Sequence, residues 1–236
     1  MRLFMEEKKQ IGTLFNRIAG SYDRLNHLLS FNFDRRWRRK AVKGMTPADS
    51  VLDVAIGTAD LAIELVRKER ARHVLGIDLS EEMMHIGQQK VEDRKLSHQI
   101  CFQLSDAQQM PFDDNTFDAV TCAYGVRNFS DLQRGLEEML RVLRPGGQLM
   151  ILEFSYPENK LIAWGYDLYF SHVMPHIGRW ISRDRSAYAY LNKSVKQFVW
   201  GEDMAAVLRR TGFDSVVYHP LTCGITTIYR ATKQGR

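Results

Sequence analysis

Short apolar runs alternate with longer amphipathic stretches through the middle of the chain. The apolar runs cover residues 50–54, 73–77, 100–104, 117–122 and 148–154. Runs of this length, bounded by Gly, Pro, Asp or Ser and separated by helical spacing, are typical of βαβ units. The pattern therefore predicts an α/β fold in which helices cover both faces of a parallel sheet.

The last part of the chain has a different pattern. The helix that carries Leu136, Leu140 and Leu143 should stop at 144–147, where the sequence reads Arg-Pro-Gly-Gly. After a further helix at about 203–210, the runs 213–218 and 225–231 are joined by a turn-prone segment, which predicts an antiparallel hairpin at the sheet edge. Five parallel strands and a hairpin make a seven-stranded, mostly parallel sheet. This Rossmann-like pattern is typical of class I S-adenosylmethionine-dependent methyltransferases rather than of dehydrogenases.

Two segments fall outside this scaffold. The chain has 236 residues, 44% of them hydrophobic, which is enough for one large core. We therefore expect a single domain made of a helical N-terminal cap (1–44), a cofactor-binding core (45–155), a helical acceptor-site insertion (156–200) and a final helix with the edge hairpin (201–236). The cap and the insertion should cover the crevice beyond the strand ends, where ligands of such sheets bind.

Charge and cysteine content exclude several classes of protein. A net charge of +5 is too small to indicate a nucleic-acid partner. Residues 124–127 read Tyr-Gly-Val-Arg where a nucleic-acid methyltransferase would carry an Asn-Pro-Pro-Tyr-type tetrapeptide. The three cysteines lack metal-ligand spacing and indicate a reduced, cytoplasmic protein without a metal site. No leader and no apolar stretch long enough to span a bilayer is expected.

Acidic residues follow three successive predicted strands. Asp53 and Gly57 belong to a strand that runs into a turn of small residues and then a helix, and they should face the methionine part of a cofactor. Asp78 ends the next strand, where a carboxylate can accept hydrogen bonds from a ribose diol, and Asp106 could accept one from an adenine amino group. Each residue alone could equally be a cap or a turn residue. Since the G-x-G-x-x-G pattern is absent, the series favours S-adenosylmethionine over a dinucleotide.

Further motifs lie at the front, in the middle and towards the end of the chain. They are Phe15-Asn16-Arg17-Ile18-Ala19, Tyr22-Asp23, Asn26, Leu29-Ser30, 34–38, Tyr124-Gly125-Val126-Arg127-Asn128, 143–147, 152–155, Asp184, 186–191, Ser194, Phe198 and 222–225. With these motifs the sequence resembles the ubiquinone/menaquinone biosynthesis C-methyltransferase family over nearly the whole chain. Three positions depart from the family pattern. Ile56 stands where the family often has Cys, Ala59 replaces a Gly, and Ala123 stands where some members have Ser.

The resemblance implies both a cofactor site and an acceptor. It gives cofactor-binding roles to Thr58, Asp78, Asp106 and Ala107. It implies C-methylation of a prenylated naphthoquinol, demethylmenaquinol, to menaquinol. A polyprenyl benzoquinol, another small phenolic or lipid acceptor, and a non-catalytic cofactor-fold scaffold remain alternatives. The residues themselves do not distinguish these alternatives.

The implied chemistry needs a group that favours a phenolate. Loss of a phenolic proton places negative charge on the adjacent ring carbon, which then attacks the sulfonium methyl group. Arg127 suits electrostatic stabilisation of that phenolate, and Asn128 could orient a water or the quinol oxygen. Tyr22 and Asp23 are the leading candidates for base or direct oxygen contact. Tyr190 and His172 are further candidates for that contact, and Arg127 could instead form a structural salt bridge.

Two features suggest where a lipid-like acceptor enters. The aromatic insertion between Trp164 and Met174 could line a tunnel for a polyprenyl tail, or simply pack as core. The basic run at 35–40, which includes Trp37, fits transient contact with anionic headgroups at the inner face of a membrane, although a solvated helix has the same pattern. The oligomeric state is open, and a homodimer is one alternative.

Overall fold

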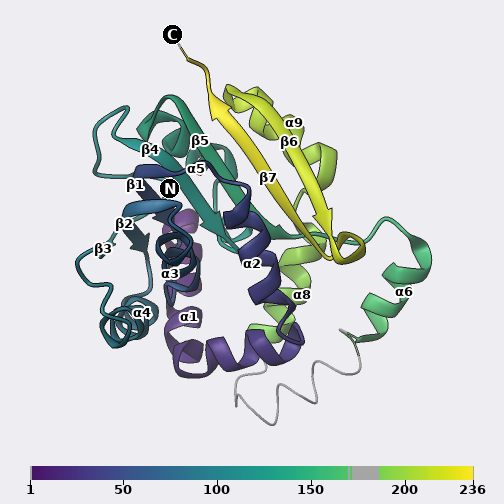
Figure 1. Ribbon diagram of the computed structural model, residues 1–236. Coiled ribbons are helices and arrows are strands. Elements are labelled where there is room, and N and C mark those ends of the chain that lie inside the picture. Colours follow the sequence, from purple (N-terminus) through teal and green to yellow (C-terminus); the bar gives the residue numbers. More distant parts are fainter. Residues whose placement is uncertain (1, 170, 172–185, 236) are drawn as a thin grey trace.

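The computed structural model describes residues 2–169, 171 and 186–235. Seven strands form one sheet in the order β3-β2-β1-β4-β5-β7-β6 (Figure 1). The strands are β1 (Ala48–Val54), β2 (Ala71–Asp78), β3 (Ile100–Leu104), β4 (Phe117–Ala123), β5 (Leu143–Phe154), β6 (Phe213–Leu221) and β7 (Thr226–Lys233). The first five are parallel, and β7 pairs antiparallel with both β5 and β6. The predicted sheet and its edge hairpin are confirmed.

Helices flank the sheet on both sides. They are α1 (Arg2–Leu29), α2 (Phe33–Lys43), α3 (Asp60–Arg67), α4 (Glu81–Asp93), α5 (Leu132–Val142), α6 (Lys160–Leu168), α8 (Ser186–Gln197) and α9 (Gly201–Thr211), with short 3₁₀ turns at Val126–Asn128 and Thr222–Gly224. No helix among these described residues is both long and apolar enough to cross a bilayer. Helices were predicted in both segments outside the scaffold, and the described parts of 1–44 and 156–200 contain them.

The start of β5 is the strand boundary that differs most from the prediction. Helix α5 stops at Val142, and Leu143 already belongs to β5, where it pairs with Phe117. The next pair in register is Ala119 with Gln148, so residues 144–147 form a bulge. Pro145 cannot donate a backbone hydrogen bond and Gly146 has a φ of 76°, which explains why the ladder is interrupted rather than started there.

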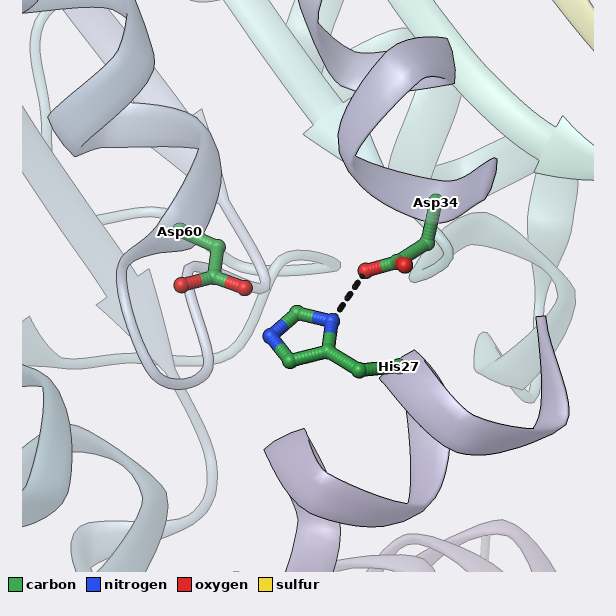
Figure 2. Close-up of side chains that lie close together, drawn as sticks. All are labelled: His27, Asp34 and Asp60. Carbon is green, nitrogen blue, oxygen red and sulfur yellow. Dashed lines mark hydrogen bonds and ion pairs between the residues drawn. The ribbon is translucent and has the colours of Figure 1, made fainter. Parts of the chain in front are cut away.

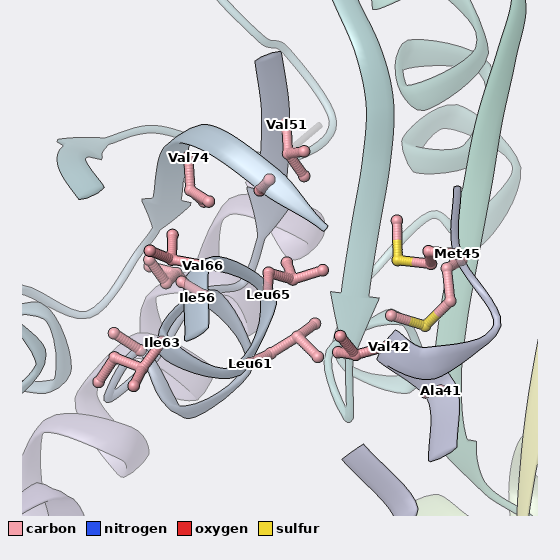
Figure 3. Packing of buried hydrophobic residues seen from close by; sticks show 14 of the residues in the cluster. Ala41, Val42, Met45, Val51, Ile56, Leu61, Ile63, Leu65, Val66 and Val74 are labelled. Atoms are coloured by element: carbon pink, nitrogen blue, oxygen red, sulfur yellow. The ribbon is translucent and has the colours of Figure 1, made fainter. Parts of the chain in front are cut away.

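Each face of the sheet has its own hydrophobic core. Apolar side chains of α2, α3 and α4 pack on one face, and those of α5 and α9 pack on the other. Figure 3 shows part of the first core, in which Leu61 and Leu65 of α3 lie close to Val42 of α2. The order of the strands reverses between β1 and β4, so both cores leave a crevice at the carboxyl ends of these two strands.

Helix α2 corrects one prediction from the sequence. The basic run at 35–40 is not a single exposed surface, because Trp37 and Arg38 point inward and are 5% and 8% exposed. The indole Nε1 of Trp37 donates a hydrogen bond of 2.8 Å to Oγ1 of Thr222. The helix is amphipathic, so only the other four basic residues of the run reach solvent.

Candidate active site

Two adjoining cavities occupy the crevice at the carboxyl ends of the strands. The large cavity has a volume of about 520 Å³, and the small cavity has about 90 Å³. Residues that line both are Phe15, Tyr22, Ala55, Gly57, Ala123 and Tyr124. Helix α1 therefore covers the two cavities together.

The small cavity contains the predicted nucleotide end of the site. Asp78 is fixed by two backbone amides, since Gly57 N–H donates to its Oδ2 at 2.8 Å and Ser80 N–H donates to its Oδ1 at 2.9 Å. Burial raises the pKa of Asp78, and these amide contacts oppose the rise. Asp106 and Ala107 line the same cavity. The structure thus brings together three of the residues predicted to hold the adenosine part of a cofactor.

Asp53 lies at the end of β1, on the wall of the large cavity. It is 1% exposed, and its Oδ1 accepts a hydrogen bond of 2.7 Å from the hydroxyl of Thr121. Its Oδ2 is buried and has no hydrogen-bond partner among the described residues. Burial raises the pKa of Asp53 to about 7 from an ordinary value of 3.8. A buried oxygen without a partner, beside a cavity, suits a cationic ligand group such as an ammonium.

Thr58 and Asp23 lie next to each other, between α1 and the start of α3. The Thr58 hydroxyl donates a hydrogen bond of 2.6 Å to Oδ1 of Asp23, while Nζ of Lys90 lies 2.8 Å from Asp23 Oδ2. Lys90 also pairs with Asp60 at the start of α3. Thr58 lines the large cavity, whereas Asp23 does not line either cavity. In this arrangement Asp23 positions the loop around Thr58 and joins it to α1.

A cluster of one histidine and two carboxylates lies beside this network (Figure 2). His27 Nδ1 lies 2.7 Å from Oδ2 of Asp34, and Asp60 faces the same space. Arg38 bridges the two carboxylates, with distances of 2.8 Å to Asp34 and 2.7 Å to Asp60. Because Arg38 and Lys90 already supply the positive charge that the two carboxylates need, the cluster is an ion-pair network joining α1, α2 and α3 rather than a metal centre.

Arg127 forms the structural salt bridge that was one of the alternatives for it. Its Nη1 lies 2.7 Å from Oε1 of Glu153, and the two side chains are 4% and 0% exposed. The same nitrogen donates a hydrogen bond of 2.5 Å to the carbonyl oxygen of Tyr124. Burial acts to lower the pKa of Arg127, but Glu153 and its other neighbours raise it overall, so the guanidinium remains charged. Arg127 is therefore a buried cation in a salt bridge, and it also lines the large cavity.

The remaining candidates surround that cation. Tyr22 is partly buried and lines both cavities, and its pKa is raised by burial against the opposing influence of Arg127. The hydroxyl of Tyr190 donates a hydrogen bond of 3.0 Å to Oδ1 of Asn128, which joins the insertion to the 3₁₀ turn after β4. Asn128 lines the small cavity and Tyr190 the large one. His172 lies outside the described residues.

Some residues that build the site were not among those predicted for it. Glu153 fixes Arg127, and Lys90 fixes Asp23. Glu153 lies near the end of the apolar strand β5, and a carboxylate at such a position could have signalled a buried partner. Lys90 gave no signal, because its place in α4 is typical of a solvated helix position. Both pairings join residues that are far apart in sequence.

Comparison with known proteins identifies the family. The model of the ubiE/COQ5 methyltransferase family matches residues 3–233. The chain belongs to this family. A demethylmenaquinone methyltransferase of Porphyromonas gingivalis is 46% identical over 230 residues, which are 96% of this chain and 94% of that protein. A family member of Geobacter sulfurreducens, named ubiquinone/menaquinone biosynthesis C-methyltransferase UbiE, is 43% identical over 97% of this chain and 90% of its own length.

Solved structures support the fold of this ubiE/COQ5 family member. The [4+2]-cyclase SpnF superposes with a TM-score of 0.73 at 18% identity, covering 97% of each chain. A possible histamine N-methyltransferase of Thermotoga maritima gives 0.65 at 19% identity, covering 94% of this chain and 99% of that one. The class I fold is confirmed, and membership of the family confirms an S-adenosylmethionine-dependent methyltransferase. Since one of these neighbours is a cyclase, the shared fold does not indicate the acceptor.

Proposed function

We propose that this ubiE/COQ5 family member methylates a ring carbon of demethylmenaquinol to give menaquinol, the final step of menaquinone biosynthesis. The observation that carries the proposal is the large cavity, in which an aromatic wall faces a buried cation. Tyr124 and Phe154 have ring centroids 4.5 Å apart, and the Arg127 guanidinium lies 5.3 Å from the Phe154 centroid. A planar hydroquinone fits such a wall, with an oxygen near the guanidinium.

The residues around both cavities fit S-adenosylmethionine. Asp53 would accept a hydrogen bond from the cofactor ammonium with its unpartnered buried oxygen. Gly57 and Thr58, in the loop before α3, would contact the methionine part, and Asp78 would face the ribose. Asp106 and Ala107 would hold the adenine. When bound, this cofactor supplies an electrophilic methyl group on a sulfonium.

The acceptor must lose two protons and regain one in forming menaquinol. The phenolic O–H proton leaves first, which makes the neighbouring ring carbon nucleophilic, and that carbon then forms a bond to the transferred methyl group. Loss of the ring C–H proton restores aromaticity, and the quinol oxygen regains a proton, so one proton is released in total. Arg127 stabilises the phenolate, and Tyr22 and Asn128 contact the quinol oxygens or a bridging water. Asp23 acts indirectly by holding Thr58 and α1 in place.

A polyprenyl benzoquinol is the second candidate acceptor. It is supported by relatives such as the Geobacter sulfurreducens protein, whose name covers both ubiquinone and menaquinone biosynthesis. Both acceptors are hydroquinones with a prenyl tail, so the same buried cation and aromatic wall could serve either. The bicyclic ring fills more of the apolar wall, which favours the naphthoquinol.

We also propose that the protein works in the cytoplasm, in transient contact with the membrane that holds its substrate. A polyprenyl quinol is dissolved in lipid, whereas S-adenosylmethionine is dissolved in water. A peripheral enzyme meets both, provided that its acceptor cavity can open toward the bilayer. A homodimer is a separate expectation that sedimentation velocity would test.

The proposed reaction can be tested by competition. Purified protein receives labelled S-adenosylmethionine together with equal amounts of reduced demethylmenaquinone and a reduced prenyl benzoquinone of the same tail length. We expect the naphthoquinol to take most of the label, and Asp78→Ala to lose at least about tenfold in cofactor affinity because the ribose loses its acceptor. Preferential labelling of the benzoquinol would favour the second candidate, and no labelling of either would reject both.

A further inference from the structure

Six large hydrophobic side chains are exposed in two segments far apart in the sequence. Leu28, Phe31 and Phe33 belong to the α1–α2 junction, and Leu161, Trp164 and Leu168 belong to α6; we refer to these six residues as the apolar rim. Leu161, Phe31 and Trp164 are 75%, 67% and 65% exposed. Single exposed apolar residues are ordinary, but a group of this size indicates an interaction surface.

The two segments meet at the mouth of the large cavity. The hydroxyl of Tyr169, which follows α6, donates a hydrogen bond of 2.9 Å to the carbonyl oxygen of Leu29, and its ring lies 6.0 Å from that of Phe31. Figure 1 shows the end of α1, the start of α2 and the helix α6 beyond the same end of the sheet. Phe31 lines the large cavity although most of its side chain is exposed, so the cavity opens to solvent there.

Helix α6 is apolar on two faces. Ile162, Tyr166 and the following Tyr169 line the large cavity. Leu161, Trp164 and Leu168 do not line it, and their spacing places them together on another face of the helix, which is exposed. A helix that only covered a cavity would present polar residues on its outer face. The second apolar face therefore needs an apolar partner of its own.

Exposed cations lie next to the rim. Arg35, Arg36, Arg39 and Lys40 of α2 are exposed, and the guanidinium of Arg36 lies 5.3 Å from the ring centroid of Phe33. Aromatic and aliphatic side chains flanked by arginine and lysine match the boundary between acyl chains and anionic headgroups. A second copy of the chain would bring these like charges together, which disfavours a dimer through this surface.

The size of the cavity points to the same partner. A cavity of about 520 Å³ is in the range that holds a compact, drug-sized ligand. It has to hold the methionine part of the cofactor beside Asp53 as well as the quinol ring, so most of a long prenyl tail must lie outside. At this mouth, the emerging tail would meet the apolar rim.

We propose that the apolar rim inserts into an anionic lipid bilayer, so that the quinol ring enters the large cavity while most of the prenyl tail stays in the membrane. This inference rests on the proposed function, because it assumes a prenylated acceptor. It adds the residues that touch the lipid and the route that the acceptor takes. Four of the basic residues noted in the sequence support this contact, while Trp37 and Arg38 take no part in it.

Flotation with lipid vesicles tests the surface without requiring turnover. The full chain is floated with vesicles of phosphatidylcholine containing about one quarter phosphatidylglycerol, and with phosphatidylcholine alone. We expect wild type to bind the anionic vesicles more strongly, and Leu161→Ser combined with Trp164→Ser to lower the partition coefficient at least about tenfold. Leu28→Ser, in the other segment, should lower it as well. The control is Val217→Ser, because Val217 is 48% exposed but lies on β6, outside the rim.

Several outcomes would overturn the inference. If wild type does not bind the anionic vesicles, or if the rim double variant binds them as well as Val217→Ser does, the proposed lipid contact is wrong. A concentration-dependent dimer that the double variant abolishes would assign the rim to a second copy of this chain. Methylation of a short-tailed, water-soluble demethylmenaquinol should be unchanged in the double variant, whose residues do not line either cavity. If wild type fails on that acceptor while the flotation difference persists, the proposed substrate is wrong and the lipid surface stands.

Discussion

Replacement of Asp53 by asparagine should stabilise the protein above neutral pH while it removes cofactor binding. Asp53 is 1% exposed, and burial raises its pKa to about 7 from 3.8. A carboxyl group with a raised pKa in the folded state favours the neutral form. Its ionisation therefore destabilises the fold. The free energy of unfolding falls as the pH rises from the pKa of Asp53 in the unfolded chain to its pKa in the folded protein. Asparagine cannot ionise and keeps an oxygen for the hydroxyl of Thr121.

The magnitude follows from the shift of about 3 pKa units. At about 1.4 kcal/mol per unit, ionised Asp53 costs roughly 4 kcal/mol above pH 7, which is an upper limit for the gain in Asp53→Asn. Between about pH 5.5 and pH 8.5 the stability gained by Asp53→Asn should grow by about 2 kcal/mol, because roughly 1.5 pH units of this interval lie below the folded pKa of about 7. The opposite effect is expected on binding, because the cofactor ammonium loses its charged partner.

Urea unfolding of wild type and Asp53→Asn at these two pH values measures the difference directly. Asp49→Asn is the matched control, because Asp49 lies on the same strand but is exposed. It should change the free energy of unfolding little at either pH. A gain in Asp53→Asn that does not depend on pH, or a loss of stability at about pH 8.5, would refute the reasoning. Calorimetric titration with S-adenosylmethionine measures the loss of cofactor affinity that we expect in Asp53→Asn.

Three further predictions concern the same site. The affinity of wild type for S-adenosylmethionine should fall about tenfold between pH 8 and pH 6, as Asp53 becomes protonated, and titration calorimetry at a series of pH values would show it. Ala59→Gly should stabilise the protein by about 1 kcal/mol in urea unfolding, because Ala59 has a φ of 63°; no gain would mean that the turn tolerates the methyl group without strain. Arg127→Met should lose about 3–5 kcal/mol of stability, because it leaves Glu153 charged and buried. Adding Glu153→Gln should restore most of that stability but not methyl transfer, and restored transfer would make the Arg127 role purely structural.

The strands could be predicted because each has a local signal. A buried parallel strand needs a continuous apolar run, and the runs ending at Asp53-Val54 and Asp78 are of this kind. The edge hairpin had a second local signal in the turn-prone segment before Gly224. The start of β5 was missed because Leu143 extends both a helical and a strand pattern, and only its pairing with Phe117 decides between them.

The contacts of the site could be predicted less well, because they join distant parts of the sequence. Arg38 was read as part of an exposed basic run, but its partner Asp60 comes from another helix. Arg127 was assigned to the site, yet its pairing with Glu153 depends on how β4 and β5 lie side by side. Asp23 was a candidate base, and its ion pair with Lys90 of α4 had no signal in the sequence. Side-chain pairing of this kind follows from the tertiary fold rather than from local pattern.

The central claim is that the methyl group goes to a ring carbon of a prenylated naphthoquinol. Its most direct test is to incubate wild type with methyl-labelled S-adenosylmethionine and reduced demethylmenaquinone, oxidise the product, and locate the label by mass spectrometry and NMR. We expect labelled menaquinone with the new methyl group on the ring carbon beside the prenyl chain, and none from Asp53→Asn. Label on a quinol oxygen, or no transfer by a wild-type protein that binds S-adenosylmethionine, would contradict the claim.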